Sequence, residues 1–289
     1  MAVRVSGYRL AGKVARCGGV GLVATAGIGL NSPRFTGDNF FAAEPLALKD
    51  ELAKAYEIAP DGVIGTNCMV AVTDYAELVK AFNAYADLYN AEHAAEIDAG
   101  ELPAKEHSSE EFIVKASGIE QRYVMDKTGI LDPKVMHPLL RHRSDDEPGL
   151  MAEMALDAAQ KALQAAGKTA ADVDAVICAA SNLERAYPAV AIEIQQLLDI
   201  NGFAFDMNVA CSSATFGIQA ASDMIRAGSV RRALVVNPEI CSGHLEWRDR
   251  DCHFIFGDVC TATLIEPQQE AQGAHFAVLS TRCATQVSN

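Results

Sequence analysis

Cys211 lies in the stretch of this sequence that best suits nucleophilic chemistry. It follows the segment Phe203 to Val209, in which large apolar residues occupy alternate positions, the period of a β-strand. Small residues predominate after it as far as Ala221, apolar residues recur there at helical spacing, and Gly228 ends the pattern. The sequence therefore places Cys211 where a strand turns into a helix, on or just before the first helical turn.

A cysteine at such a position is suited to reaction as a thiolate. The first backbone N–H groups of a helix have no partner within the helix, and the helix dipole adds positive potential there. Both effects stabilise a thiolate and make a thiol more nucleophilic. The small residues behind Cys211 allow close approach of another element, so we expect the helix to be buried. The alternative is an inert cysteine that only packs.

Four stretches of the sequence resemble one enzyme family. The run Asp206 to Ala221 (DMNVACSSATFGIQAA) resembles the nucleophile segment of β-ketoacyl-acyl-carrier-protein synthase III, in the thiolase superfamily. Ser117 to Arg122 is similar to the family's T-G-I-x-x-R, and Asp172 to Ser181 to the strand before its first substrate loop. Arg250 to Ala262 is similar to its R-x-x-x-x-x-F-G-D-G-A segment. The four occur in the family's order.

The resemblance implies an α/β protein with a layered, thiolase-like fold. It corresponds to one half of a duplicated fold, a mixed and mostly parallel sheet with a buried helix after the nucleophile. Residues 62–289 are expected to form this N-terminal half, with an insertion at about 92–111, and residues 1–61 an extension of uncertain structure. The family's C-terminal half supplies a catalytic His and a catalytic Asn. No stretch here matches it, so we expect that half to be absent from this chain.

The local pattern agrees with a β-α-β-α-β alternation, which gives parallel strands with right-handed crossovers. Two further predicted strands, at 259–266 and 275–282, are expected to form a hairpin. The pattern predicts helices at 46–56, 73–93, 149–166, 188–198 and after Cys211, strands at 175–180, 203–209, 232–237, 259–266 and 275–282, and a strand-and-turn segment at 112–125. Residues 62–66 resemble the family's first strand and residues 27–33 resemble the part that follows it, so the place of the first strand stays open between the two.

The resemblance also implies the reaction of a 3-oxoacyl-acyl-carrier-protein synthase III of fatty acid biosynthesis. Cys211 is expected to attack an acyl thioester and keep the acyl group. Malonyl-acyl carrier protein then loses carbon dioxide, and its carbanion attacks the acyl-cysteine. No separate cofactor is implied, because acyl-CoA is the substrate and carrier-protein phosphopantetheine the acceptor, and a homodimer is expected. Without the His and Asn, we expect the chain to acylate and doubt that it condenses.

The resemblance assigns three residues to the coenzyme A donor: Ser108, Phe112 and Arg250. Arg250 matches a family arginine that faces the donor's nucleotide, and Ser108 falls near a threonine with a similar task. Phe112 stands where the family has a tryptophan that stacks on adenine, and Ala116 where it has an arginine. Phenylalanine still stacks, but alanine cannot replace charge-assisted bonds. A surface ion pair with a neighbouring aspartate is the alternative role for Arg250.

Composition limits the classes of partner. The sequence has 24 basic and 38 acidic residues, a net charge of −14, which argues against general nucleic-acid binding. No apolar run is long enough to span a membrane. The eight cysteines show no paired spacing and match no common zinc site, so we expect reduced thiols, no metal and a cytoplasmic protein. Arg231, Arg232 and Arg248 suggest a basic spot for an acidic carrier protein, or a solvated strand edge.

Two other functions are compatible with the sequence. A single half of the fold exposes the apolar face that its sister half covers, and would act as a non-catalytic interaction or dimerisation module. Other thiolase-like acyltransferases share the placement of the cysteine and use other acceptors. Acylation of Cys211 by an acyl thioester distinguishes an enzyme from the non-catalytic module.

Overall fold

The computed structural model divides the chain into two compact units. The first consists of residues 1–139 and 242–256, and the second of residues 140–241 and 257–289. The structure describes residues 9, 12, 16, 21–24, 40–60, 64–67, 75–119, 121–144, 146–272 and 275–284.

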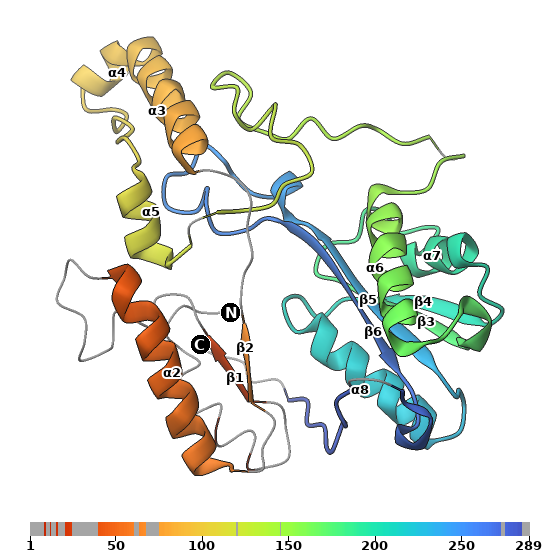
Figure 1. The fold of residues 1–289 in the computed structure, drawn as a ribbon. Helices are drawn as coiled ribbons and strands as arrows, with labels where there is room; N and C mark the ends of the chain where they lie inside the picture. The colour runs from red at the N-terminus through yellow and green to blue at the C-terminus, as the bar shows by residue number, and fades with distance from the viewer. Residues whose placement is uncertain are drawn as a thin grey trace. The chain divides into compact units, whose positions relative to one another are not determined.

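The second unit is built on a four-stranded sheet in the order β4-β3-β5-β6 (Figure 1). Strands β3, β4 and β5 run parallel, and β6 runs antiparallel to β5. This confirms the predicted mixed, mostly parallel α/β sheet. The strands are β3 (Ala175–Ala179), β4 (Phe203–Met207), β5 (Ala233–Ile240) and β6 (Asp258–Ile265).

Helices cover both faces of this sheet (Figure 1). Val176 and Cys178 of β3 pack with α6 and α7, whereas Ala175, Ile177 and Ala179 pack with α8. All five β3 residues are buried, so a continuous apolar run forms a central strand as predicted. The helices are α6 (Leu150–Ala166), α7 (Val190–Leu198) and α8 (Ser213–Arg226), with short 3₁₀ turns η2 (Ala170–Asp172) and η4 (Gln268–Glu270).

Helix α8 lies close to the sheet because a glycine faces it. A Cβ atom added to Gly217 would lie 2.9 Å from Val235 Cγ1 and 3.0 Å from Ala179 Cβ. Gly217 belongs to the buried face of α8, together with Ser213, Ala221 and Ser222. The small residues seen in the sequence therefore set how near the helix approaches the strands. The sequence predicted a buried helix, and the structure buries one face of α8.

The first unit has an aromatic and apolar core. Tyr75, Phe82, Ile113 and Trp247 are among its buried residues. Trp247 comes from the 242–256 segment, which leaves the sheet after β5 and returns to it at β6. The helices are α2 (Phe40–Ile58), α3 (Tyr75–Glu92), α4 (Ala94–Asp98) and α5 (Glu110–Ser117), with η3 (Cys241–Gly243) at the chain's passage between units.

Two short strands in the amino-terminal region pair with each other. β1 (Gly21–Ala24) runs parallel to β2 (Ile64–Asn67). β2 overlaps residues 62–66, one of the two segments that resemble the family's first strand, whereas the other, 27–33, lies outside the described residues. β1 lies inside the predicted extension of uncertain structure. Most of the remaining residues of that extension before residue 40 lie outside the described ones.

The prediction of a strand and turn at 112–125 was wrong at its start, where the structure has α5. Ser109 caps this helix: its hydroxyl accepts a hydrogen bond from Phe112 N–H at 3.0 Å. Glu110 and Glu111 occupy the first turn, and Gly118 ends the helix with φ of 70°. A serine cap, acidic first turn and terminal glycine favour a helix, and they outweigh the β-propensity of the apolar residues.

The predicted strand at 275–282 was also wrong, because residues 275–284 have no strand structure. β6 pairs instead along its whole length with β5, from Ala233–Ile265 to Ile240–Asp258. Phe276 remains 84% exposed, so the alternating apolar residues of this segment pack against no sheet. The sequence predicted a hairpin between 259–266 and 275–282. In the structure β6 pairs with β5, which precedes it in the chain.

No helix within the described ranges is long and apolar enough to cross a membrane.

Candidate functional site

Cys211 lies in the turn between β4 and α8. Helix α8 begins at Ser213 and Ser212 is its N-cap residue, so Cys211 directly precedes the helix, as predicted. Ala210 has a positive φ of 48°, a conformation that residues with a side chain adopt rarely. The Cys211 side chain is exposed. The turn therefore leaves this side chain accessible to solvent just before the amino end of α8, where the helix dipole adds positive potential.

Ser213 holds the turn in this shape. Its hydroxyl oxygen accepts a hydrogen bond from Val209 N–H at 2.8 Å. The same hydroxyl lies 2.7 Å from the carbonyl oxygen of Ala210 and 3.2 Å from that of Ala180, both within donating distance. Because Ser213 is only 2% exposed, water cannot replace these bonds at low cost.

Asn208 ties the turn to the loop that follows β3. Its side-chain oxygen accepts from Ala210 N–H at 2.9 Å, and its amide donates to the Ser181 carbonyl at 2.8 Å. Sequence reasoning missed the roles of Asn208 and Ser213. The signal available was a pair of short polar side chains on either side of the cysteine, the residue types that bond to nearby backbone.

The turn with Cys211 lies at the carboxyl end of β4, and the parallel strands β3 and β5 end on the same side of the sheet. Glu239 near the end of β5 accepts two hydrogen bonds from Ser181, from the N–H at 2.6 Å and from the hydroxyl at 2.7 Å. Cys241 follows, with its sulfur 3.9 Å from a Glu239 carboxylate oxygen. Burial, followed by the charges of Glu239 and Asp258, raises the pKa of Cys241 to about 11. Cys241 is therefore a protonated, weakly nucleophilic neighbour.

Other cysteines are also poorly suited to act as nucleophiles. Burial raises the pKa of Cys178 well above its ordinary value, that of Cys252 to about 11 and that of Cys260 to about 12. Of the six cysteines that the structure describes, Cys211 is the exposed one. Among these six, Cys211 is therefore the thiol most accessible to an electrophile in solution.

In the first unit, the structure brings Phe112 and Arg250 together. The guanidinium carbon of Arg250 lies 3.9 Å from the centre of the Phe112 ring. Arg250 Nε donates to the carbonyl of His107 at 2.8 Å, which fixes the plane of the guanidinium. Loose ion pairs to Glu106 at 3.8 Å and Asp251 at 3.9 Å accompany the stack. The half-buried pair forms a flat cation–aromatic surface, called here the Phe112–Arg250 platform.

Ser108 follows His107, the residue that Arg250 bonds, and it is buried. Its backbone exchanges two hydrogen bonds with the side chain of Asn83, at 2.8 and 3.1 Å. Its hydroxyl lies 3.3 Å from Nε2 of His253, and the residue is 5% exposed. Sequence reasoning missed His253 as a partner, because no local pattern connects two residues so far apart in the chain.

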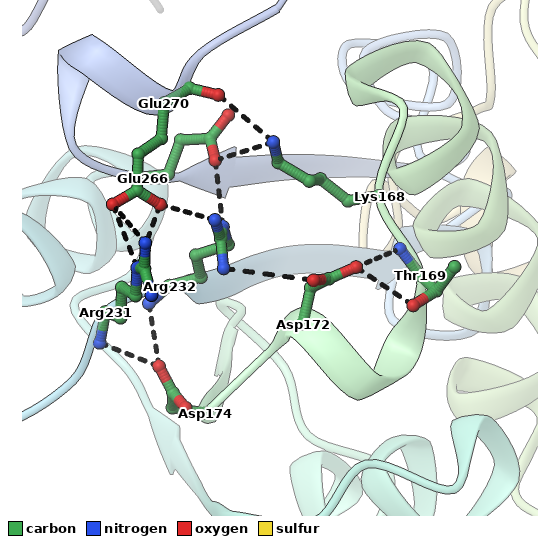
Figure 2. Close-up of polar contacts among 8 residues, drawn as sticks. All are labelled: Lys168, Thr169, Asp172, Asp174, Arg231, Arg232, Glu266 and Glu270. Carbon is green, nitrogen blue, oxygen red and sulfur yellow. Dashed lines mark hydrogen bonds and ion pairs between the residues drawn. The ribbon is translucent and has the colours of Figure 1, made fainter.

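The arginines considered as a basic spot do not form one free patch. Arg231 and Arg232 belong to an ion-pair cluster at the end of the second unit's sheet, and Arg248 belongs to the first unit. Figure 2 shows the Arg231 side chain directed at Glu270 and the Arg232 side chain directed at Glu266 and Glu270. Arg232 bonds Glu266 at 2.9 Å, and Arg231 bonds Glu270 at 2.8 Å. Their charges are thus compensated within the unit.

The chain is similar to acyl-carrier-protein synthases of known sequence. A family model described as 3-oxoacyl-[acyl-carrier-protein (ACP)] synthase III matches residues 205–286, a range that includes Cys211 and Arg250. The beta-ketodecanoyl-[acyl-carrier-protein] synthase of Pseudomonas aeruginosa is 57% identical over 212 residues, which cover 73% of this chain and 61% of that protein. The beta-ketoacyl-[acyl-carrier-protein] synthase III of Chelativorans sp. is 37% identical over 174 residues, 60% of this chain and 47% of that protein.

Solved structures of similar proteins overlap with parts of the chain. A crystal structure of 3-oxoacyl-(acyl carrier protein) synthase III from Pseudomonas aeruginosa PAO1 matches with 31% identity and a TM-score of 0.39, covering 44% of this chain and 39% of that one. The chain spans 61% of the length of the first relative and 47% of the second.

Proposed function

We propose that this chain is an acyltransferase whose nucleophile is Cys211. The proposal starts from the similarity of the chain to the β-ketoacyl-acyl-carrier-protein synthase III family in the thiolase superfamily. The observation that carries the proposal is the exposed Cys211 sulfur, held by a hydrogen-bonded turn directly before α8. Both the family match and the local geometry concern the same residue.

The proposed first half-reaction is a thioester exchange. The Cys211 thiolate attacks the carbonyl carbon of an acyl thioester, and the carbonyl electrons move to oxygen. When that oxyanion collapses, the bond to the donor sulfur breaks, the donor leaves as a thiolate that takes up a proton, and the acyl group stays on Cys211. Backbone N–H groups at the start of α8, including that of Cys211, would stabilise the oxyanion.

For the second half-reaction we propose malonyl-acyl carrier protein as the acceptor. Its decarboxylation gives a carbanion that attacks the acyl-Cys211 thioester, so the product is a 3-oxoacyl-acyl carrier protein and the cysteine is released. The names of the relatives support a carrier-protein acceptor. This reaction would belong to fatty acid biosynthesis. It needs hydrogen-bond donors toward the thioester oxygen of malonyl-acyl carrier protein, the role that the resemblance gives to a His and an Asn for which this sequence has no matching stretch, so we expect this chain by itself to complete only the acylation.

Coenzyme A is the donor that the first unit favours. The Phe112–Arg250 platform offers a ring that stacks on a nucleotide base and a cation that attracts phosphate. Ala116 supplies no second arginine, so we expect a single cationic contact from these two positions. Of the three residues assigned by resemblance, Phe112 and Arg250 are the ones with partly exposed side chains.

We also propose a homodimer that forms through the edge of the second unit. β4 lies at the edge of the four-stranded sheet. Phe203 is 45% exposed and stacks on Phe205 with ring centres 6.5 Å apart. An edge strand of this kind is a template for pairing with another chain, and pairing of β4 with β4 of a second copy would satisfy two-fold symmetry.

Isotope exchange tests the acylation half-reaction without any acceptor. Unlabelled octanoyl-CoA is mixed with the chain and isotopically labelled free coenzyme A, and label entering the octanoyl-CoA pool is measured. We expect exchange well above the uncatalysed rate, because acylation of Cys211 is reversible. We also expect octanoyl-CoA to exchange faster than acetyl-CoA. The 57% identical relative is named for a beta-ketodecanoyl product, and condensation with malonyl-acyl carrier protein adds two carbons, so such a product arises from an eight-carbon acyl group. Exchange no faster than without protein would contradict the proposal, and a preference for acetyl-CoA would contradict only the chain length.

A further inference from the structure

Two buried polar residues belong to the chain segments that carry the Phe112–Arg250 platform. Ser108 is 5% exposed and His253 is fully buried. The His253 ring stacks on Phe82 with ring centres 4.7 Å apart and an interplanar angle of 8°. It also meets Phe254 edge-on at 5.5 Å. Such a packed imidazole has a fixed ring position, so the direction of its two nitrogens is fixed as well.

The hydrogen bonds of His253 define its tautomer. Nδ1 lies 3.0 Å from the carbonyl oxygen of Asp249. Because a carbonyl oxygen only accepts, Nδ1 must carry the hydrogen. Burial lowers the pKa of His253, against smaller opposing effects of the Asp249 backbone bond and charge, and the Arg250 charge lowers it further. The ring is therefore neutral at neutral pH, and Nε2 accepts the hydrogen bond that the Ser108 hydroxyl donates at 3.3 Å.

This bond connects the two chain segments that carry the platform. Ser108 directly precedes Ser109, the cap of α5, and Phe112 lies in the first turn of that helix. His253 follows Arg250 by three residues, and its backbone N–H bonds the Asp249 carbonyl at 2.9 Å. A second link joins the same segments, because Arg250 Nε donates to the His107 carbonyl. The relative position of the Phe112 ring and the Arg250 guanidinium thus depends on both links.

We propose that His253 and Ser108 are positioning residues for the Phe112–Arg250 platform, and that their hydrogen bond sets the affinity of the chain for the nucleotide part of coenzyme A. The proposal rests on the donor assigned under the proposed function. It gives Ser108 a role other than direct contact with the donor, because its hydroxyl is buried and engaged with His253.

The test compares two probes by titration calorimetry: coenzyme A, and pantetheine, which lacks the nucleotide. His253→Phe keeps an aromatic ring against Phe82 and removes the acceptor, whereas His253→Gln places an oxygen near the position of Nε2. Ser108→Ala removes the donor, and Ser108→Thr keeps it. Thermal unfolding of every variant is recorded, so that affinities are compared among folded proteins.

We expect His253→Phe and Ser108→Ala each to weaken coenzyme A binding about fivefold to tenfold, as for one lost buried hydrogen bond. The double variant should lose no more than His253→Phe alone, since Ser108→Ala removes only a bond that this variant already lacks. Pantetheine binding should be unchanged, and His253→Gln and Ser108→Thr should recover most of the affinity.

Three results would overturn the inference. Equal weakening of both probes would show a general structural role, and additive losses in the double variant would show that the two residues act separately. Unchanged coenzyme A affinity in His253→Phe, with a clear loss in Arg250→Ala, would leave the donor site standing and reject the positioning role. If the unaltered chain binds coenzyme A no more tightly than pantetheine, the donor assignment itself fails, and the inference with it.

Discussion

Replacing Cys211 with alanine is expected to reduce the exchange of coenzyme A into acyl-CoA to the uncatalysed rate. The acyl group then has no sulfur to occupy between donors, so the loss should be at least about a thousandfold, as for removal of a nucleophile. The fold should be unaffected, because the Cys211 side chain is exposed. The measurement is the isotope exchange described above, with a far-UV circular dichroism spectrum of each protein.

Cys283→Ala is the matched control for that experiment. Cys283 is a partly exposed thiol of the same unit, and its sulfur lies 2.9 Å from the side-chain oxygen of Gln219 in α8. Its removal should leave the exchange rate within about twofold, because the proposed reaction does not use it. Exchange that persists in Cys211→Ala, or that disappears in Cys283→Ala, would assign the reaction to another group.

Replacing Arg232 with methionine is expected to destabilise the second unit by about 3 kcal/mol, the cost of breaking a buried ion pair. Arg232 and Glu266 have side chains 12% and 8% exposed, and they bond at 2.9 Å. Arg232 also contacts Glu270, whereas Lys168 approaches Glu266 at 3.5 Å. Without Arg232, the Glu266 carboxylate loses its hydrogen bond from Arg232 Nε and keeps only the longer contact to Lys168 at low exposure.

Figure 2 shows that the side chains of this cluster come from segments next to different strands of the sheet. Asp174 accepts the backbone N–H groups of Arg231 and Arg232 at 2.7 and 2.9 Å, so the entry to β5 is tied to the entry to β3. Glu266 and Glu270 follow β6. The cluster therefore joins the ends of three strands of the sheet.

Urea unfolding followed by circular dichroism measures the effect, with Arg226→Met as the control. Arg226 and its partner Asp223 are 51% and 56% exposed and 3.5 Å apart, so their pair should contribute less than about 1 kcal/mol. Equal losses in the two variants would mean that burial of the Arg232 cluster adds nothing to its stability.

Local sequence patterns predicted the nucleophile turn well. The strand before Cys211, the turn and the small-residue helix each depend on neighbours within a few positions, and the apolar run of β3 signalled a strand covered on both faces. Gly167 has a φ of 63° and ends α6 where the sequence predicted. These features are encoded locally, so a reading of periodicity and end signals recovers them.

Features that depend on distant parts of the chain were not predictable in this way. β6 pairs with β5 and not with the following segment, because packing of the whole sheet decides strand partners. No local signal shows that residues 242–256 belong to the first unit. It is nevertheless this segment that places Arg250 against Phe112 and His253 against Ser108. At α5, the apolar and β-branched residues favoured a strand. The Ser109 cap is an equally local signal, and it favours the helix that the structure has.

The resemblance to a family assigned roles that geometry alone would not have assigned. It placed Phe112 and Arg250 together as donor contacts, and the structure has their side chains stacked. It placed Ser108 beside them, and the structure has the Ser108 hydroxyl buried against His253. The role of the donor platform stays a proposal, which the binding experiments address.

Peptide mapping after incubation with octanoyl-CoA tests the central claim most directly. The chain is digested, and the mass of each cysteine-containing peptide is compared with that from an untreated sample. We predict that the peptide containing Cys211 gains the mass of one octanoyl group and loses it again on treatment with hydroxylamine, which cleaves thioesters. An octanoyl group found on Cys241 or another cysteine, or on none, would contradict the assignment of Cys211 as the acyl-accepting residue.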